Sequence, residues 1–323
     1  MNSAPWGWQP SDPSRSEQAG YLIRLDGPDT GRFLHGQTSS AIEGQQPGSW
    51  IPSCCTTATG RLRALAEVLV DRDGAWLLLR GADGTALWQA LERVLFPADR
   101  VQLGPVTAVR WITPLGDGCD ALPQVADGSW IALEDGSGWL LGRQLVLLAN
   151  AELPAWLADR APLRAREQER WRIQQGVPAA PGEINDDTNP FEVGLADRVS
   201  LSKGCYVGQE TLAKLATYDG VKQQLRRWIW RAEATGTAPG SPPDGEPPSP
   251  GTGLVTSAGE RAGVITSVLH LAAPDPAGAV VLGLALVRRS ALAETHLLAG
   301  GRALEISTPA AFEAPPVGAG KGA

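Results

Sequence analysis

The sequence contains the octapeptide KGCYVGQE at residues 203–210, and this segment carries most of its chemical information. Gly204 and Gly208 flank Cys205 and permit a tight or positive-φ backbone, which would project the thiol from a loop. The positive charge of Lys203, two residues earlier, can favour the thiolate form of Cys205. We therefore take Cys205 and Lys203 as candidate catalytic residues, with a buried structural cysteine in a glycine turn as the alternative.

The chain is irregular before this octapeptide and helical after it. Residues 177–210 form a polar stretch, and a loop this long in a compact chain is usually functional or disordered. Residues 152–176 are rich in Arg, Glu, Gln and Leu and predict a helix that Gly176 ends. A short helix is expected over 211–218, and Glu210 can begin it because the helix dipole favours a carboxylate there.

The N-terminal part of the chain mixes strands and helices. We predict a strand and turn over 21–29, a short helix over 30–42, two strands over 50–71 joined by a turn at Gly60, a strand over 75–81 and a helix over 82–99. The first helix should bury Phe33 and Leu34, and the second should place on one face Leu87, Leu91, Val94 and Leu95. Strands, then a helix, then strands predict an α+β fold rather than regular βαβ winding.

The C-terminal part reads as strands separated by turn residues. These strands are expected over 223–232, 253–257, 261–270, 279–289 and 302–308, the pattern of a small antiparallel barrel or sandwich. The Pro/Gly-rich insertion at 235–252 cannot pack a core, so we expect an extended excursion there.

The predicted domain organisation has four parts. They are a disordered tail over 1–19, a region of two interleaved α+β subdomains over 20–222, a barrel over 223–310 and a second disordered tail over 311–323.

Composition narrows the classes of function. The 323 residues carry a net charge of −7, which argues against a nucleic-acid partner held by counterion release, so no direct DNA binding is expected. The four cysteines and three histidines have no metal-ligand spacing, so no metal site is expected. There is no run of about 18 apolar residues and no secretory signal, and we expect a cytoplasmic protein with free thiols.

Several segments together resemble one known family. KGCYVGQE is similar to the K-G-C-[FY]-x-G-Q-E signature of the YgfZ family, folate-binding proteins related to the T-protein of the glycine cleavage system. Other segments of the chain are similar to further motifs of the family and occur in the order that the family has. They are DGPDTGRFLHGQTSS at 26–40, CCTTATGRLRA at 54–64, RWRIQQGVP at 170–178, GVITS at 263–267 and GLALVRR at 283–289. The resemblance covers roughly residues 20–310.

The resemblance implies a fold and a role. The fold would be a cloverleaf of three small domains around a folate cavity, the last a β-barrel. The role would be to support iron–sulfur cluster assembly or repair and, through it, tRNA modification, acting through Cys205. The cofactor would be tetrahydrofolate or a derivative, and the partners iron–sulfur client proteins or the assembly machinery. We also expect a monomer without membrane association.

The resemblance also suggests which residues bind folate. PFEVGL at 190–195 is similar to P-x-E-A-G-L of T-proteins, where the glutamate holds the pterin. A pterin presents a 2-amino group beside N3–H, and the Glu192 carboxylate could accept both in parallel. A solvated loop glutamate is the alternative. The other candidate cofactor-binding residues are Gln37, Arg172, Tyr206, Gln209 and Glu210.

The sequence departs from the T-protein pattern at one informative place. T-proteins use an aspartate in a G-G-hydrophobic-x-D-D hairpin to transfer a one-carbon unit. Aligning Gly60 puts Ala64 and Leu65 at the acidic positions, which opposes aminomethyl transfer. A folate-dependent aminomethyltransferase therefore stays as the alternative function, and a module that binds folate or a client without chemistry is a third.

Overall fold

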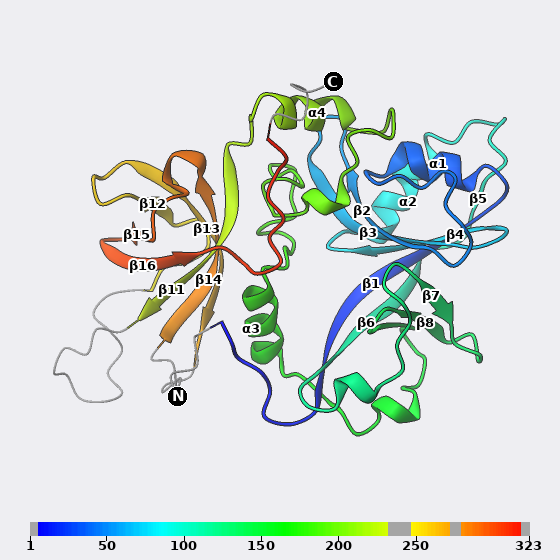
Figure 1. Ribbon diagram of the computed structural model, residues 1–323, viewed down its shortest axis with the longest axis horizontal. Helices are drawn as coiled ribbons and strands as arrows, with labels where there is room; N and C mark the ends of the chain where they lie inside the picture. The colour runs from blue at the N-terminus through cyan, green and yellow to red at the C-terminus, as the bar shows by residue number, and fades with distance from the viewer. Residues whose placement is uncertain (1–5, 232–246, 272–278, 318–323) are drawn as a thin grey trace.

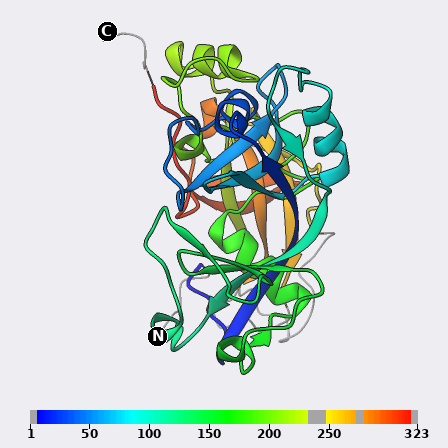
Figure 2. The same ribbon diagram turned by 90° about the vertical axis from the view of Figure 1, so that its right-hand side faces the viewer.

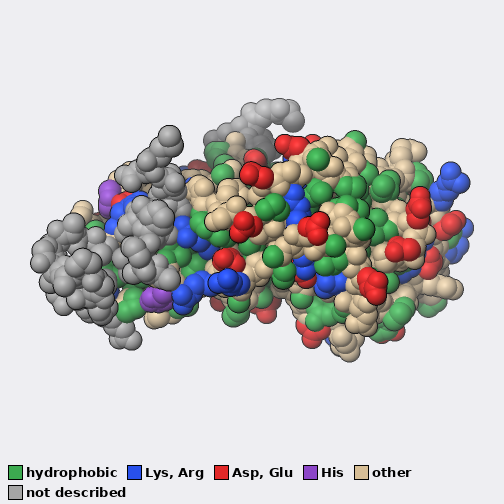
Figure 3. Space-filling model, turned by 90° about the horizontal axis from the view of Figure 1, so that it is seen from below, with side chains coloured by type: hydrophobic (Ala, Val, Ile, Leu, Met, Phe, Trp, Pro, Cys, Tyr) green, Lys and Arg blue, Asp and Glu red, His purple; other side chains and the backbone are tan. Residues whose placement is uncertain are grey.

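The structure, a computed structural model, describes residues 6–231, 247–271 and 279–317. Within these residues the chain forms an α+β body on a ten-stranded sheet and a closed six-stranded antiparallel barrel, with one helix between them (Figure 1). The predicted α+β class and C-terminal barrel are confirmed. In the view of Figure 3, acidic and basic side chains are interspersed over the body.

The body sheet is organised around its first strand, β1 (Ser14–Asp26), which pairs antiparallel with both β4 and β6. Figure 2 shows β1 running along much of the body. The strand order is β2-β3-β4-β1-β6-β9-β8-β7, with β5 and β10 also pairing with β1. The other strands are β2 (Trp50–Thr56), β3 (Leu62–Val70), β4 (Gly74–Arg80), β5 (Gln102–Leu103), β6 (Thr107–Leu115), β7 (Trp130–Ala132), β8 (Gly138–Leu141), β9 (Gln144–Leu148) and β10 (Ala161–Pro162).

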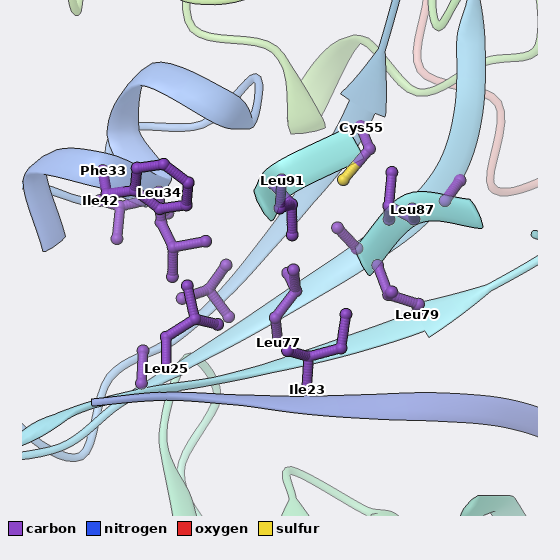
Figure 4. Close-up of a cluster of buried hydrophobic side chains, with 14 of the residues drawn as sticks. Ile23, Leu25, Phe33, Leu34, Ile42, Cys55, Leu77, Leu79, Leu87 and Leu91 are labelled. Atoms are coloured by element: carbon purple, nitrogen blue, oxygen red, sulfur yellow. The ribbon is translucent and has the colours of Figure 1, made fainter. Parts of the chain in front are cut away.

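Two short helices, α1 (Thr30–Gln37) and α2 (Gly84–Glu92), cover one face of this sheet. Their buried side chains pack on the inward-facing residues of β1 and β4 in one core cluster (Figure 4). The cluster includes Ile23, Leu25, Phe33, Leu34, Leu77, Leu79, Leu87 and Leu91. Helix α2 ends at Glu92, so Val94 lies beyond the helix and is 42% exposed instead of sharing the buried face.

Helix α3 (Ala165–Gln175) is shorter than the helix predicted over 152–176. The first part of that stretch contains a 3₁₀ turn and β10, because Pro154 and Pro162 lack the N–H that helix interiors require. The helix ends as predicted at Gly176, which adopts the left-handed conformation with φ +74°. The short helix predicted over 211–218 is α4 (Gln209–Thr217).

The barrel closes in the order β11-β14-β13-β12-β15-β16 around a core that includes Trp228, Leu254 and Leu297. Its strands are β11 (Gln223–Arg231), β12 (Gly253–Val255), β13 (Arg261–His270), β14 (Ala279–Arg288), β15 (His296–Ala299) and β16 (Arg302–Ser307). Strand β15 has no counterpart in the prediction. A separate core cluster joins the barrel to the body and includes Leu65 of β3 and Ile229 of β11.

The two predicted disordered tails are in part ordered. Residues 14–19 belong to β1, where pairing with β6 and β10 buries the polar side chains of Ser14, Arg15 and Ser16. Near the other end, the N–H of Glu313 donates to the carbonyl of Gly194 at 3.1 Å. Residues 1–5 and 318–323 lie outside the described residues, as does the part of the predicted insertion over 235–246.

Candidate functional site

Two adjacent cavities lie where the body meets the barrel. The first has a volume of about 960 Å³ and the second of about 710 Å³, and Asp187 and Gln223 line both. The first is lined by Arg61, Asp187, Glu192, Asp219, Gly220, Val221, Lys222, Gln223, Arg288, Arg289 and Ser290. We call it the Glu192 cavity.

Glu192 is a buried carboxylate in the wall of this cavity, with only 4% of its surface exposed. A tight turn holds it, because the Asn189 side-chain oxygen accepts the N–H of Phe191 at 3.0 Å and that of Glu192 at 3.2 Å. The N–H of Asn189 in return donates to Glu192 Oε2 at 3.1 Å. Burial raises the pKa of Glu192, and the Asn189 N–H and the nearby charge of Arg61 act in the opposite direction.

Arg61 is a cavity residue to which the sequence analysis assigned no role. It follows the Gly60 turn, where Thr57 accepts the Arg61 N–H on its hydroxyl at 3.1 Å. Its guanidinium donates to the carbonyl of Asp187 and lies 4.0 Å from Glu192 Oε2. Arg61 belongs to the segment CCTTATGRLRA at 54–64, which resembles a family motif. The neighbouring residues in the sequence do not indicate that its side chain faces Glu192.

Arg172 lines the second cavity instead of the Glu192 cavity, and its donors are all engaged. It forms a bidentate pair with Glu169 at 2.8 and 2.7 Å. It also donates to the Val177 carbonyl, to Glu183 and to the Ser267 hydroxyl. These five bonds use the whole guanidinium, so this side chain ties α3 to the barrel and has no donor left for a ligand.

Cys205 is exposed, as predicted for a projecting thiol. It lies between two glycines with left-handed backbone, Gly204 at φ +98° and Gly208 at φ +87°. The Thr56 hydroxyl donates to the Val207 carbonyl at 2.6 Å, which fixes this loop on the hairpin between β2 and β3.

Lys203 anchors the same loop to the C-terminal end of α1. Its ammonium donates to the carbonyls of His35, Thr38 (2.6 Å) and Ser40 (2.7 Å), and it lies 4.5 Å from the centre of the Tyr206 ring. These acceptors use all three N–H groups, so none is left to donate to the Cys205 thiol, and the effect of the Lys203 charge on that thiol stays a prediction. Burial lowers the pKa of Lys203 to about 7, an effect that the carbonyls and the ring oppose.

His35 completes the anchor from the other side. Its Nε2 donates to the Lys203 carbonyl at 2.8 Å, while its Nδ1 accepts the N–H groups of Ile42 and Glu43 at 3.3 and 3.1 Å. Lys203 and His35 therefore bond to each other in both directions, from ammonium to carbonyl and from imidazole to carbonyl.

The four remaining candidates line neither cavity. Gln37 is the half-buried last residue of α1, and Gln209 is the first residue of α4. Glu210 is exposed and pairs with Lys214 at 2.7 Å. Tyr206 belongs to a hydrophobic cluster, and its hydroxyl has no hydrogen-bond partner among the described residues. Burial raises the pKa of Tyr206.

The hairpin over 56–61 connects the cysteine loop to the Glu192 cavity. An atom at the Cβ position of Gly60 would lie 3.2 Å from Thr211 of α4, so the turn fits closely under that helix. The next residue, Arg61, lines the cavity. One short element thus contacts both the loop of the exposed thiol, through Thr56, and the buried carboxylate, through Arg61.

The positions of the missing T-protein carboxylates are apolar in this structure as well. Ala64 and Leu65 are adjacent in β3, are at most 3% exposed and pack into two different core clusters. Among the described residues, no group of three or more His, Cys, Asp or Glu side chains could hold a metal ion. No helix in the described ranges has the length and apolar character needed to cross a membrane.

Comparison with known proteins places the chain among relatives of two kinds. No protein-family model matches it. A putative chloroplastic transferase of Arabidopsis thaliana is 30% identical over 234 residues, which cover 63% of this chain and 52% of that protein. The chain thus spans about half the length of this plant relative.

Three bacterial relatives bear the name tRNA-modifying protein YgfZ. That of Cronobacter sakazakii is 25% identical over 276 residues, which cover 77% of this chain and 78% of the relative. That of Serratia proteamaculans is 25% identical over 228 residues, which cover 64% and 68%. These similarities confirm the predicted resemblance to the YgfZ family.

A solved structure shows the same fold. The glycine cleavage system aminomethyltransferase T of Bartonella henselae matches with a TM-score of 0.71 and 15% identity, over 94% of this chain and 86% of that one. At this identity the likeness establishes the fold alone, and it confirms the predicted T-protein-like architecture.

Proposed function

We propose that this relative of the YgfZ proteins is a folate-binding accessory factor that supports iron–sulfur cluster assembly or repair and, through it, tRNA modification, acting through Cys205. The proposal rests chiefly on one arrangement: the hairpin over 56–61 contacts the loop of the exposed Cys205 thiol through Thr56 and lies beside the buried Glu192 carboxylate through Arg61. The bacterial relatives are named for tRNA modification, in agreement with this role.

The Glu192 cavity fits a reduced folate. Its volume of about 960 Å³ is in the range of small-molecule sites, roughly 300–1,000 Å³. The carboxylate of Glu192 can accept the 2-amino and N3–H groups of a pterin in parallel, and such charge-assisted bidentate pairs are strong. Asn189 and the turn at 189–192 hold the carboxylate in place before any ligand binds.

Cys205 is the thiol best placed to meet a partner or a cluster. Cys54 and Cys55 are buried, and burial raises the pKa of both to about 12, so their thiols stay protonated. Cys119 is half-buried, and its sulfur accepts from Arg160 at 3.4 Å. Only Cys205 of the four is exposed. Free thiols throughout fit a reducing compartment, and we propose the cytoplasm.

Two alternatives make different predictions. An aminomethyltransferase would turn over an aminomethyl donor in the presence of tetrahydrofolate, but Ala64 and Leu65 offer no carboxylate to assist that step. A module that only binds folate or a client would keep its function when the Cys205 thiol is alkylated.

Calorimetric titration with 5-formyltetrahydrofolate tests the folate part of the proposal. The wild-type protein should bind, and Glu192→Ala should lower the affinity about ten- to a hundredfold, because a charge-assisted bond is worth about 1.5–3 kcal/mol. Glu210→Ala is the matched control, since that glutamate is exposed and pairs only with Lys214. Unchanged affinity in Glu192→Ala would remove Glu192 from the site, and no binding by the wild type would refute the folate assignment.

A further inference from the structure

The mouth of the Glu192 cavity carries two exposed cations, Lys222 and Arg288. Lys222 directly precedes β11 and Arg288 ends β14. The two strands pair there, with Gln223 opposite Arg288. The two cations therefore lie on adjacent strand ends, and no ion pair within 4.0 Å involves either of them in the part of the chain that the structure describes.

A third cation, Arg289, is already neutralised and stiffens this rim. Its guanidinium donates to both the carbonyl and the carboxylate of Asp219, and its N–H donates to the Lys222 carbonyl at 2.8 Å. Asp219 has φ +50°, a left-handed conformation that non-glycine residues rarely adopt. Arg289 thus fixes the backbone that presents Lys222, and it leaves Lys222 and Arg288 free for a ligand.

The charged side chains of the cavity differ in burial, and Arg61 lies 4.0 Å from the buried Glu192. Glu192 is a buried acceptor in its wall, whereas Lys222 and Arg288 are exposed donors at its mouth. Lys222 lines the cavity, and its charge opposes the rise that burial causes in the pKa of Glu192. A complementary ligand has paired N–H donors at one end and anionic groups at the other.

We infer that Lys222 and Arg288 form a subsite for the carboxylates of the glutamyl tail of a folate. This inference rests on the proposed folate binding and extends it to the opposite end of the ligand. An arginine guanidinium matches a carboxylate with two parallel N–H bonds, and a lysine ammonium serves as a mobile point charge for a second one. The contacts are exposed, so their contribution should depend on ionic strength.

The test compares two ligands on the Lys222→Ala/Arg288→Ala double variant. The ligands are 5-formyltetrahydrofolate, which has the glutamyl tail, and 6-methyltetrahydropterin, which lacks it. We expect the variant to bind the folate about tenfold more weakly at low salt, with a smaller difference at high salt, because two exposed ion pairs contribute modestly. The affinity for the pterin should not change. The control for removal of a surface cation is Arg261→Ala, on an exposed barrel residue that lines neither cavity.

Each other outcome contradicts the inference in a distinguishable way. Equal folate affinity in variant and wild type would exclude a tail subsite while leaving the folate function intact. An equal loss for both ligands would show that the cations act on the pterin or on the fold, and the denaturation midpoint separates these two. A wild-type protein that binds neither ligand would refute the proposed function and this inference with it.

Discussion

The Lys203 ammonium occupies a position where the negative end of a helix dipole concentrates. The carbonyls that it reaches, of His35, Thr38 and Ser40, belong to the last turn of α1 and the residues after it. Unsatisfied carbonyls at a helix C-terminus attract cations. The lysine therefore positions the cysteine loop.

Replacing Lys203 with alanine should destabilise the protein. Removal of three charge-assisted bonds in a partly buried place should lower the free energy of unfolding by about 1–3 kcal/mol. Lys214→Ala is the control, because its pair with Glu210 is exposed and should contribute under about 0.5 kcal/mol. Urea denaturation measures both variants. Equal midpoints for the two variants would show that the Lys203 anchor adds no stability.

Glu192 should make folate binding depend on pH. Burial raises its pKa, so part of the population is protonated at pH values where an exposed glutamate is fully charged. The pterin donors need the carboxylate, so binding releases a proton and the affinity should fall as the pH is lowered through the raised pKa. The same raised pKa affects the stability of the free protein in the opposite direction. Protonation of Glu192 adds to the free energy of unfolding at low pH, and this contribution is lost as the pH rises through the raised pKa.

The measurement is calorimetry of folate binding at several pH values in buffers that differ in ionisation enthalpy. The buffer comparison reports the number of protons released. Glu192→Gln keeps the shape of the side chain but cannot titrate, so it should abolish this proton release. A wild-type affinity that stays flat as the pH is lowered from neutral through the raised pKa of Glu192 would contradict the assignment.

The hairpin over 56–61 depends on close backbone approach at Gly208. A Cβ atom there would lie 2.6 Å from the Thr57 carbonyl oxygen and 2.9 Å from Gly60 Cα, whereas a Cβ atom at Gly204 would meet nothing within 4 Å. Both glycines have positive φ. A comparison of alanine at Gly204 with alanine at Gly208 therefore separates two effects. At both positions alanine is strained by the positive φ, and only at Gly208 does its Cβ atom also clash with other backbone atoms.

Gly208→Ala should be clearly more damaging than Gly204→Ala. We expect about 1 kcal/mol for Gly204→Ala, the cost of a left-handed alanine, and more than about 2 kcal/mol for Gly208→Ala, which adds a clash with backbone atoms. Denaturant unfolding gives both values. Similar losses would mean that the loop does not sit on the hairpin as described.

The sequence predicted those elements whose side chains alternate or repeat regularly and whose ends carry turn residues. The strands from β2 to β4 and the end of α3 at Gly176 are examples. It missed the first half of β1, because its side chains are polar and are buried by neighbours from distant parts of the chain. Short β15 carries too few residues for a periodic signal.

Only those residues of the candidate site that stand in a short sequence motif could be predicted from the sequence. Glu192 and Cys205 each stand in a short recognisable segment, and the structure places one in a cavity wall and the other on the surface. Arg61, Lys222 and Arg288 reach the cavity through tertiary folding, which brings the β2–β3 hairpin to the ends of two barrel strands. The spacing of these residues along the chain does not predict that the hairpin and the strand ends lie side by side.

Both described ends of the chain hold the barrel against the body. Arg227 of β11 stacks on Trp6 at 4.6 Å, and its neighbour Arg226 stacks on Phe312 at 5.2 Å. Gln174 of α3 exchanges two 3.0 Å hydrogen bonds with the backbone of Trp8. These contacts explain why segments with the composition of tails are ordered. They also support the junction at which the two cavities lie.

The central claim is that the Cys205 thiol carries the function of the whole molecule. Its most direct test is complementation of a bacterial strain that lacks its YgfZ-type protein, with iron–sulfur-dependent tRNA thiolation as the readout. Wild type and Cys119→Ala should restore thiolation, whereas Cys205→Ala should fail at equal protein level, because that thiol is exposed and its removal disturbs no packing. Full restoration by Cys205→Ala would show that the thiol is dispensable and would contradict the proposed function.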